Sequence, residues 1–140
     1  MNENIIKIFC DGGARGNPGP AAAAFVVEVG GKIFYKGSKF LGIATNNVAE
    51  YNALILALLW LKENLGKTNG SGAFIFLDSE LVVNQMSGTF KIKNENLRSL
   101  YVKAKAVEKS IGSGLKYFSV TREKNKLADF LVNQTLDENI

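Results

Sequence analysis

The 140-residue sequence contains no histidine, which excludes every mechanism that uses an imidazole as a base, a partner for a nucleophile or a metal ligand. It has one cysteine, Cys10, so neither a disulfide framework nor a cysteine-rich zinc site can form. Catalysis, if the protein has any, must therefore depend on carboxylates, lysine, tyrosine, hydroxyl groups or a bound metal.

Long hydrophobic runs are also missing. The longest, residues 53–61, is far shorter than the roughly 20 residues of a bilayer-spanning helix. The first ten residues, MNENIIKIFC, lack the basic segment of a signal peptide. We therefore expect a cytoplasmic protein with no membrane association. The length and a hydrophobic content of 46% predict a single domain, residues 1–140, with a core of ordinary size.

Acidic residues are scarce in one part of the chain. Residues 91–126 contain ten Lys or Arg and three Glu, a net charge of +7, whereas the whole chain carries +4. The remainder is therefore negative by about three charges. This asymmetry suggests a polyanionic partner, although a solvated basic face is the commoner explanation of such a charge distribution.

The chain is predicted to form an α/β fold. Short apolar segments typical of strands alternate with segments of helical periodicity, and a Gly/Pro-rich loop is expected over residues 12–20. The expected strands are residues 5–10, 21–29, 32–40, 73–77 and 115–120, and the expected helices are residues 45–64, 79–86, 94–110 and 125–136. This order predicts a five-stranded mixed sheet, with three antiparallel strands followed by two parallel strands, flanked by helices.

Two of the four aspartates, Asp11 and Asp78, directly follow apolar strands. Ligands of α/β proteins collect outside the carboxyl ends of parallel strands, so both carboxylates are candidates for a site there. Either residue could instead cap a turn or a helix, and "DSEL" at Asp78 resembles a helix N-cap. The residues alone leave both interpretations open.

Two further acids belong to predicted helices. The helical neighbours of Glu50 are apolar, which means that its carboxylate needs a partner other than water. Asp129 lies between Asn125 and Asn133 at helical spacing, which by itself fits a solvated polar stripe. If the four acids converged, they would repel one another unless a cation compensated them. Mg²⁺ prefers carboxylate oxygens, and two such ions roughly 3.5–4 Å apart serve phosphodiester cleavage.

Four motifs together resemble the type 1 ribonuclease H family, within the wider retroviral-integrase-like nuclease superfamily. They are "DGGARGNPGP" at residues 11–20, "ATNNVAEYNAL" at 44–54, "LDSELVV" at 77–83 and "VTREKNKLADFL" at 120–131. The motifs follow the family's order and spacing, and the resemblance covers essentially the whole chain. It implies an RNase H-like fold for the sheet and helices predicted above.

The resemblance also implies an activity. The family hydrolyses the RNA strand of RNA/DNA hybrids and leaves 3′-hydroxyl and 5′-phosphate ends. Its four catalytic acids match Asp11, Glu50, Asp78 and Asp129, which by this resemblance hold two Mg²⁺ ions, with Mn²⁺ as a substitute. Asp11 is expected to bridge both ions. Members of the family are mostly monomeric, so a monomer is expected here.

Substrate contacts follow from the same matching. The implied substrate-binding residues are Gly12, Gly13, Asn17, Thr45, Asn46, Asn47, Gln85, Phe90, Lys91, Lys93 and Asn125, with Arg98 as a further phosphate contact. Many members carry a histidine before the last aspartate, whereas this chain has Arg122 in that loop. We expect Arg122 to assist catalysis through a charge contact rather than by proton transfer.

Two alternatives to this function remain. One is a nuclease of the same fold that cuts DNA, and the other is a catalytically inactive module that binds nucleic acid. A kinase or other P-loop enzyme fits less well, since the sequence has no G-x-x-x-x-G-K-[ST] motif.

Overall fold

The structure is a computed structural model that describes residues 5–68, 72–88, 91–112 and 114–140. Its elements follow the predicted order of strands and helices. They are β1 (Ile6–Ala14), β2 (Gly19–Val29), β3 (Lys32–Ala44), α1 (Asn46–Thr68), β4 (Ala73–Leu77), α2 (Glu80–Met86), α3 (Glu95–Ile111), β5 (Leu115–Ser119), the 3₁₀ turn η1 (Arg122–Asn125) and α4 (Lys126–Asn139).

The five strands form one mixed sheet in the order β3-β2-β1-β4-β5, which confirms the predicted fold class. β1, β2 and β3 pair antiparallel, while β4 pairs parallel to β1 and β5 pairs parallel to β4. A turn at Gly30 and Gly31 connects β2 to β3. Both glycines have positive φ angles, 61° and 79°, which explains why glycine occupies this hairpin turn.

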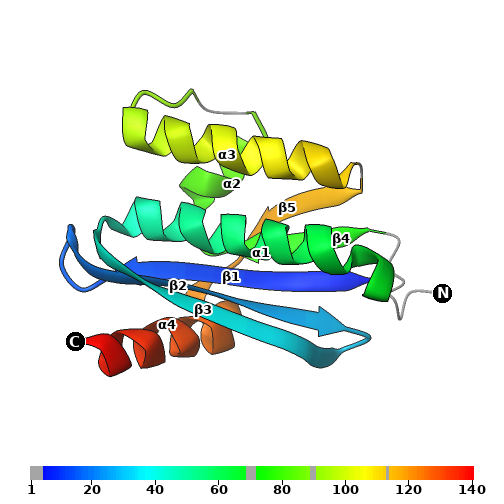
Figure 1. Ribbon diagram of the computed structural model, residues 1–140, viewed down its shortest axis with the longest axis horizontal. Helices are drawn as coiled ribbons and strands as arrows, with labels where there is room; N and C mark the ends of the chain where they lie inside the picture. Colours follow the sequence, from blue (N-terminus) through cyan, green and yellow to red (C-terminus); the bar gives the residue numbers. More distant parts are fainter. Residues whose placement is uncertain (1–4, 69–71, 89–90, 113) are drawn as a thin grey trace.

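Helices cover the sheet on both sides (Figure 1). α1 lies on one face, and α3 packs against α1 on the side away from the sheet. α4 covers the opposite face at β1, β2 and β3. Residues 21–27 of β2 are buried on both sides, because the α1 core meets one face of this strand and a smaller α4 cluster meets the other. None of the described helices is long and apolar enough to cross a bilayer.

The predicted loop over residues 12–20 is wrong at both ends. β1 continues through Asp11 to Ala14, and β2 already begins at Gly19. Small residues occupy this part of the sheet on both strands, and Gly12 pairs with Ala23. They carry little strand propensity of their own, but the antiparallel ladder satisfies their backbone groups and keeps them extended.

Asp11 nevertheless lies at an edge of parallel pairing. The β1–β4 ladder ends at Cys10 opposite Leu77, so the next residues of the two strands are Asp11 and Asp78. Asp11 therefore follows the carboxyl end of the parallel pairing with β4, as the sequence predicted. On its other side, β1 continues in the antiparallel ladder with β2.

Other predicted boundaries were too short. β3 continues to Ala44, α1 to Thr68 and α4 to Asn139. The missed end of β3, residues 41–44, is apolar but contains Gly42, which has a positive φ angle of 77° where the pairing with β2 is irregular. A glycine normally indicates the end of a strand, whereas here it lies at a bulge within one.

Candidate active site

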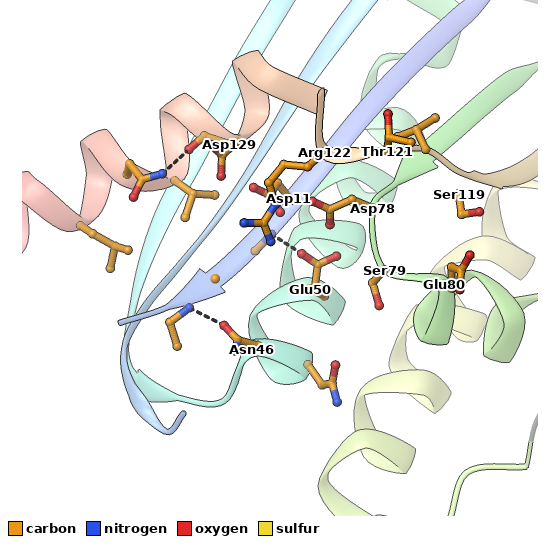
Figure 2. A pocket seen from close by; sticks show the side chains of 18 of the residues that line it. Asp11, Asn46, Glu50, Asp78, Ser79, Glu80, Ser119, Thr121, Arg122 and Asp129 are labelled. Carbon is orange, nitrogen blue, oxygen red and sulfur yellow. Dashed lines mark hydrogen bonds and ion pairs between the residues drawn. The ribbon is translucent and has the colours of Figure 1, made fainter. Parts of the chain in front are cut away.

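A cavity of about 800 Å³ opens where β1 and β4 end. All four predicted acids line it, together with Arg122, Asn46 and Asn47. Figure 2 shows the carboxylates of Asp11, Glu50 and Asp78 turned toward one another, while Asp129 projects from α4. Side chains separated by 118 positions in the sequence therefore meet in one place.

Glu50 reaches this cavity from the first turns of α1. Glu50 is 5% exposed, and its Oε1 accepts a hydrogen bond of 2.8 Å from the backbone N–H of Gly12. Gly12 permits this contact because it has no side chain. A Cβ at this position would lie 2.2 Å from the carbonyl carbon and oxygen of Ala49. The predicted "partner other than water" for Glu50 is thus partly the backbone of β1.

Asp78 follows β4 directly and precedes a short helix. The interpretation that Asp78 caps this helix is wrong, because the N-cap is Ser79, whose Oγ accepts from the N–H of Val82 at 3.3 Å. The Asp78 carboxylate is left to face the cavity, and its side chain is 13% exposed. Its Oδ2 has no hydrogen-bond partner among the described residues.

Asp11, Glu50 and Asp78 form one compact carboxylate group. One oxygen of each lies within 4.8 Å of the others. Burial raises the pKa of Asp11 to about 7; a hydrogen bond involving Glu50 opposes this shift, and the charges of Asp78 and Asp129 reinforce it. Burial and the neighbouring Asp11 likewise raise the pKa of Glu50 well above its usual value.

Asp129 and Arg122 lie at the edge of this carboxylate group. Asp129, on the first turn of α4, lines the same cavity and is close enough for its charge to act on Asp11. Arg122 Nε is 3.8 Å from Asp78 Oδ2, in an ion pair whose arginine side chain is 81% exposed. Burial raises the pKa of Asp78, and the charge of Arg122 opposes that rise. Arg122 is thus placed for a charge contact with Asp78, and its role in catalysis stays a prediction.

Two asparagines of the predicted substrate-binding set, Asn17 and Asn46, join the β1–β2 turn to the start of α1. The backbone N–H of Asn46 donates to Asn17 Oδ1, and the N–H of Ala14 donates to Asn46 Oδ1, each over 2.9 Å. Thr45 accepts from the N–H of Val48 through its Oγ1 at 3.2 Å and so caps α1. The amide oxygens of Asn17 and Asn46 are thereby engaged, and both side chains stay on the exposed surface.

Two residues that were predicted to contact substrate, Gln85 and Asn125, are buried. Gln85 is 4% exposed and accepts a hydrogen bond from the hydroxyl of Tyr51, so it lies inside the α1–α2 packing rather than on the groove. Asn125 is 1% exposed, and its Nδ2 donates to the carbonyl of Cys10 over 2.8 Å. Asn125 therefore attaches the start of α4 to β1 one residue before Asp11, instead of facing substrate.

The other predicted contacts differ in their placement. Gly12, Gly13, Asn46 and Asn47 line the cavity, whereas Lys91 and Arg98 line a separate hollow with Ile92 and Tyr101. Lys93 is exposed outside both. Phe90 lies outside the described residues, so its predicted role is not tested.

Sequence reasoning missed two charged residues that line the cavity, the acid Glu80 and the cation Arg15. Arg15 follows the "DGGA" stretch and lines the cavity beside the acids. The signal that could have identified Arg15 is its position: an arginine between the acid of β1 and Asn17 lies within a predicted binding loop.

The donor set fits a divalent cation. Buried Glu50 Oε2 and Asp78 Oδ2 lack hydrogen-bond partners among the described residues, and isolated buried carboxylate oxygens are costly without compensation. The available atoms are hard carboxylate oxygens, which Mg²⁺ prefers. Burial and mutual repulsion raise the pKa values of these acids, and a bound cation relieves both penalties.

A family model described as RNase H matches residues 3–136. The chain belongs to the RNase H family. This RNase H chain is 36% identical over 137 residues to "Ribonuclease HI" of Halobacterium salinarum, covering 95% of the chain and 65% of that protein. It is 40% identical over 134 residues to "Bifunctional protein Rv2228c" of Mycobacterium tuberculosis, covering 94% of the chain. The chain spans about a third of the length of that relative, 35%.

A solved structure of LC11-RNase H1 in complex with an RNA/DNA hybrid resembles this RNase H chain closely. The TM-score is 0.89 and the sequence identity 40%, with 95% of this chain and 97% of that chain covered. The likeness therefore covers nearly all of this chain.

Proposed function

We propose that this protein is an endonuclease that hydrolyses the RNA strand of RNA/DNA hybrids with the help of two divalent metal ions. The expected metal is Mg²⁺. The observation that carries the proposal is the group of Asp11, Glu50 and Asp78, whose oxygens lie within 4.8 Å of one another in an open cavity. Membership of the RNase H family and the likeness to a hybrid-bound RNase H1 support the choice of substrate.

The four acids would hold the metal ions. Asp11, on the central strand, would hold them together with Glu50 and Asp78, and Asp129 would complete the set from α4. When bound, the ions supply activation of the attacking water and stabilisation of the leaving 3′ oxygen, which gives 3′-hydroxyl and 5′-phosphate ends. The protein's own part is to position the acids on rigid elements and to orient the substrate.

The asparagines would distinguish RNA from DNA. Asn17 and Asn46 use their amide oxygens within the protein, and no hydrogen bond among the described residues uses their Nδ2 groups. These Nδ2 groups are donors at the cavity's edge, where they can bind the 2′-hydroxyl that only RNA carries. The bond from the Asn46 N–H orients the Asn17 amide, and the bond from the Ala14 N–H orients the Asn46 amide.

A substrate panel tests the proposal. The protein is incubated with labelled RNA/DNA hybrid, double-stranded RNA and double-stranded DNA, first with Mg²⁺ and then with EDTA. We expect cleavage of the RNA strand of the hybrid only, abolished by EDTA and restored by added Mg²⁺. Cleavage of DNA would favour a same-fold DNA nuclease, and hybrid binding without cleavage would favour an inactive binding module. Either result contradicts the proposal.

A further inference from the structure

Arg15 is the only cation besides Arg122 among the described residues that line the acidic cavity. The turn that carries it is rigid: the N–H of Arg15 donates to the carbonyl of Pro20 over 2.8 Å, and a Cβ at Gly19 would lie 2.0 Å from the carbonyl oxygen of Arg15. The backbone therefore fixes where this side chain starts.

A single atom of the Arg15 guanidinium makes all its contacts. Nη2 lies 2.8 Å from Asp137 Oδ1, 3.2 Å from Asn133 Oδ1 and 3.4 Å from the carbonyl of Asn133. Its other donors, on Nε and Nη1, make no hydrogen bond with the described residues. A guanidinium with two unused donor groups can still bind a phosphate by donating two parallel hydrogen bonds to it.

The ion pair between Arg15 and Asp137 is weak. The side chain of Asp137 is 68% exposed and that of Arg15 is 39% exposed, and an exposed ion pair is worth about 0–1 kcal/mol. A phosphate of a nucleic-acid backbone can replace such a partner at little cost. Asp137 lies outside the residues that line the cavity, so the exchange would turn the guanidinium toward the bound strand.

We infer that Arg15 is a phosphate-binding residue for the hybrid backbone, and that Asp137 holds it in place until the hybrid displaces this carboxylate. The inference rests on the proposed function and adds a contact to its substrate site. Arg15 provides a positive charge in a cavity lined by five acids, at the side where α4 meets the β1–β2 turn.

A purely structural role makes a different prediction. If Arg15 served only to join the turn to α4, removal of either partner would break the same link. Arg15→Gln and Asp137→Asn would then weaken hybrid binding alike. If Arg15 binds a phosphate, the two substitutions act in opposite directions, since Asp137→Asn removes a competitor for the guanidinium.

The test measures hybrid binding by fluorescence anisotropy over a series of salt concentrations, in the full chain with Asp11→Asn and without metal. We expect Arg15→Gln to raise the Kd about threefold to tenfold and to reduce the log–log salt slope by about 1. Asp137→Asn is expected to lower the Kd about twofold, and Arg15→Lys should retain the salt slope. Matched controls are Lys36→Gln, an exposed lysine on β3, and Glu138→Gln beside Asp137.

The outcomes separate this inference from the proposed function. If Arg15→Gln behaves like Lys36→Gln, or if Asp137→Asn weakens binding as Arg15→Gln does, the inference is overturned while hybrid binding itself stands. If the Asp11→Asn protein binds the hybrid no better than double-stranded DNA, both are overturned. Melting temperatures of all variants show whether each is folded. If Arg15→Gln is not, Arg15→Lys and Asp137→Asn decide, since only phosphate binding predicts a lower Kd for Asp137→Asn.

Discussion

The backbone N–H of Gly12 donates to Glu50 Oε1 over 2.8 Å, so one hydrogen bond joins β1 to α1 directly beside Asp11. This bond determines how closely the helix approaches the strand. It therefore holds Glu50 of α1 beside Asp11 of β1 through a contact between the strand backbone and the Glu50 side chain.

Gly12→Ala is expected to destabilise the protein by about 1–3 kcal/mol or more, because the new Cβ would lie 2.2 Å from backbone atoms of Ala49 that cannot move without moving α1. Urea unfolding measures the loss. Gly13→Ala is the control, since its Cβ would meet Val132 Cγ1 at an ordinary 3.7 Å. Equal losses in the two variants would show that the close approach of α1 is not the cause.

The stability of the metal-free protein should depend on Asp11. Burial raises the folded-state pKa of this carboxyl to about 7, so the folded protein binds the proton more tightly than the unfolded chain. That contribution is fully present below the ordinary carboxyl pKa and is lost as pH rises through about 7. In EDTA, the melting temperature of the wild type should therefore fall as pH rises toward neutrality.

Asp11→Asn removes this titration. We expect its melting temperature in EDTA to exceed that of the wild type at neutral and higher pH, with a shallower decline as pH rises. Glu138→Gln, which changes an exposed acid, should follow the wild type. Calorimetry across the pH range measures both. Parallel wild-type and Asp11→Asn profiles would contradict the assigned burial of the carboxylate.

Asn125→Ala is expected to cost about 1–3 kcal/mol, because it leaves the buried carbonyl of Cys10 without its donor. Thermal unfolding measures the loss. Asn139→Ala is the matched control. It removes a similar bond of 2.7 Å to Thr135 on the last turn of α4, where water can take over, and should cost under about 1 kcal/mol. A loss for Asn125→Ala no larger than that of the control would contradict the role assigned to Asn125 as the link between α4 and β1.

Arg122→Gln should move the acidic limb of the pH–activity profile to higher pH. The guanidinium lowers the pKa of Asp78, so its removal lets that carboxyl hold its proton to higher pH. Because the pair is 3.8 Å long and Arg122 is largely exposed, cleavage at alkaline pH should fall by less than about tenfold. Arg122→Lys retains the charge and should keep the limb in place. An unshifted limb in Arg122→Gln would exclude the charge contact.

The fold class could be predicted from the sequence because its signals are local, whereas the four acids were assigned through the resemblance of four motifs to a family. Each apolar strand is a short run, and Asp11 and Asp78 directly follow two of them. The same local reading failed where neighbours in space decide the structure. Residues 12–14 have turn-forming composition but form strand through pairing with β2. Gln85, which the family resemblance assigned to substrate, is buried and accepts a hydrogen bond from Tyr51.

Positions that act through distant partners were also beyond the sequence. The bond from Asn125 to Cys10 joins residues 115 positions apart, and Arg15 meets Asn133 across 118 positions. Nothing in the spacing of these residues indicates that α4 packs beside the β1–β2 turn. The resemblance to a family identified Asn125 as a site residue, but only the fold shows that it binds the backbone of β1.

The most direct test of the central claim is single-turnover cleavage of a labelled RNA/DNA hybrid in Mg²⁺ by the wild type and by Asp11→Asn, with Glu138→Gln as the control. Asp11 lies within 4.8 Å of both Glu50 and Asp78, so we predict that Asp11→Asn abolishes cleavage and leaves hybrid binding nearly intact. Cleavage by Asp11→Asn at the wild-type rate would contradict the assignment of these acids as the metal-binding catalytic site.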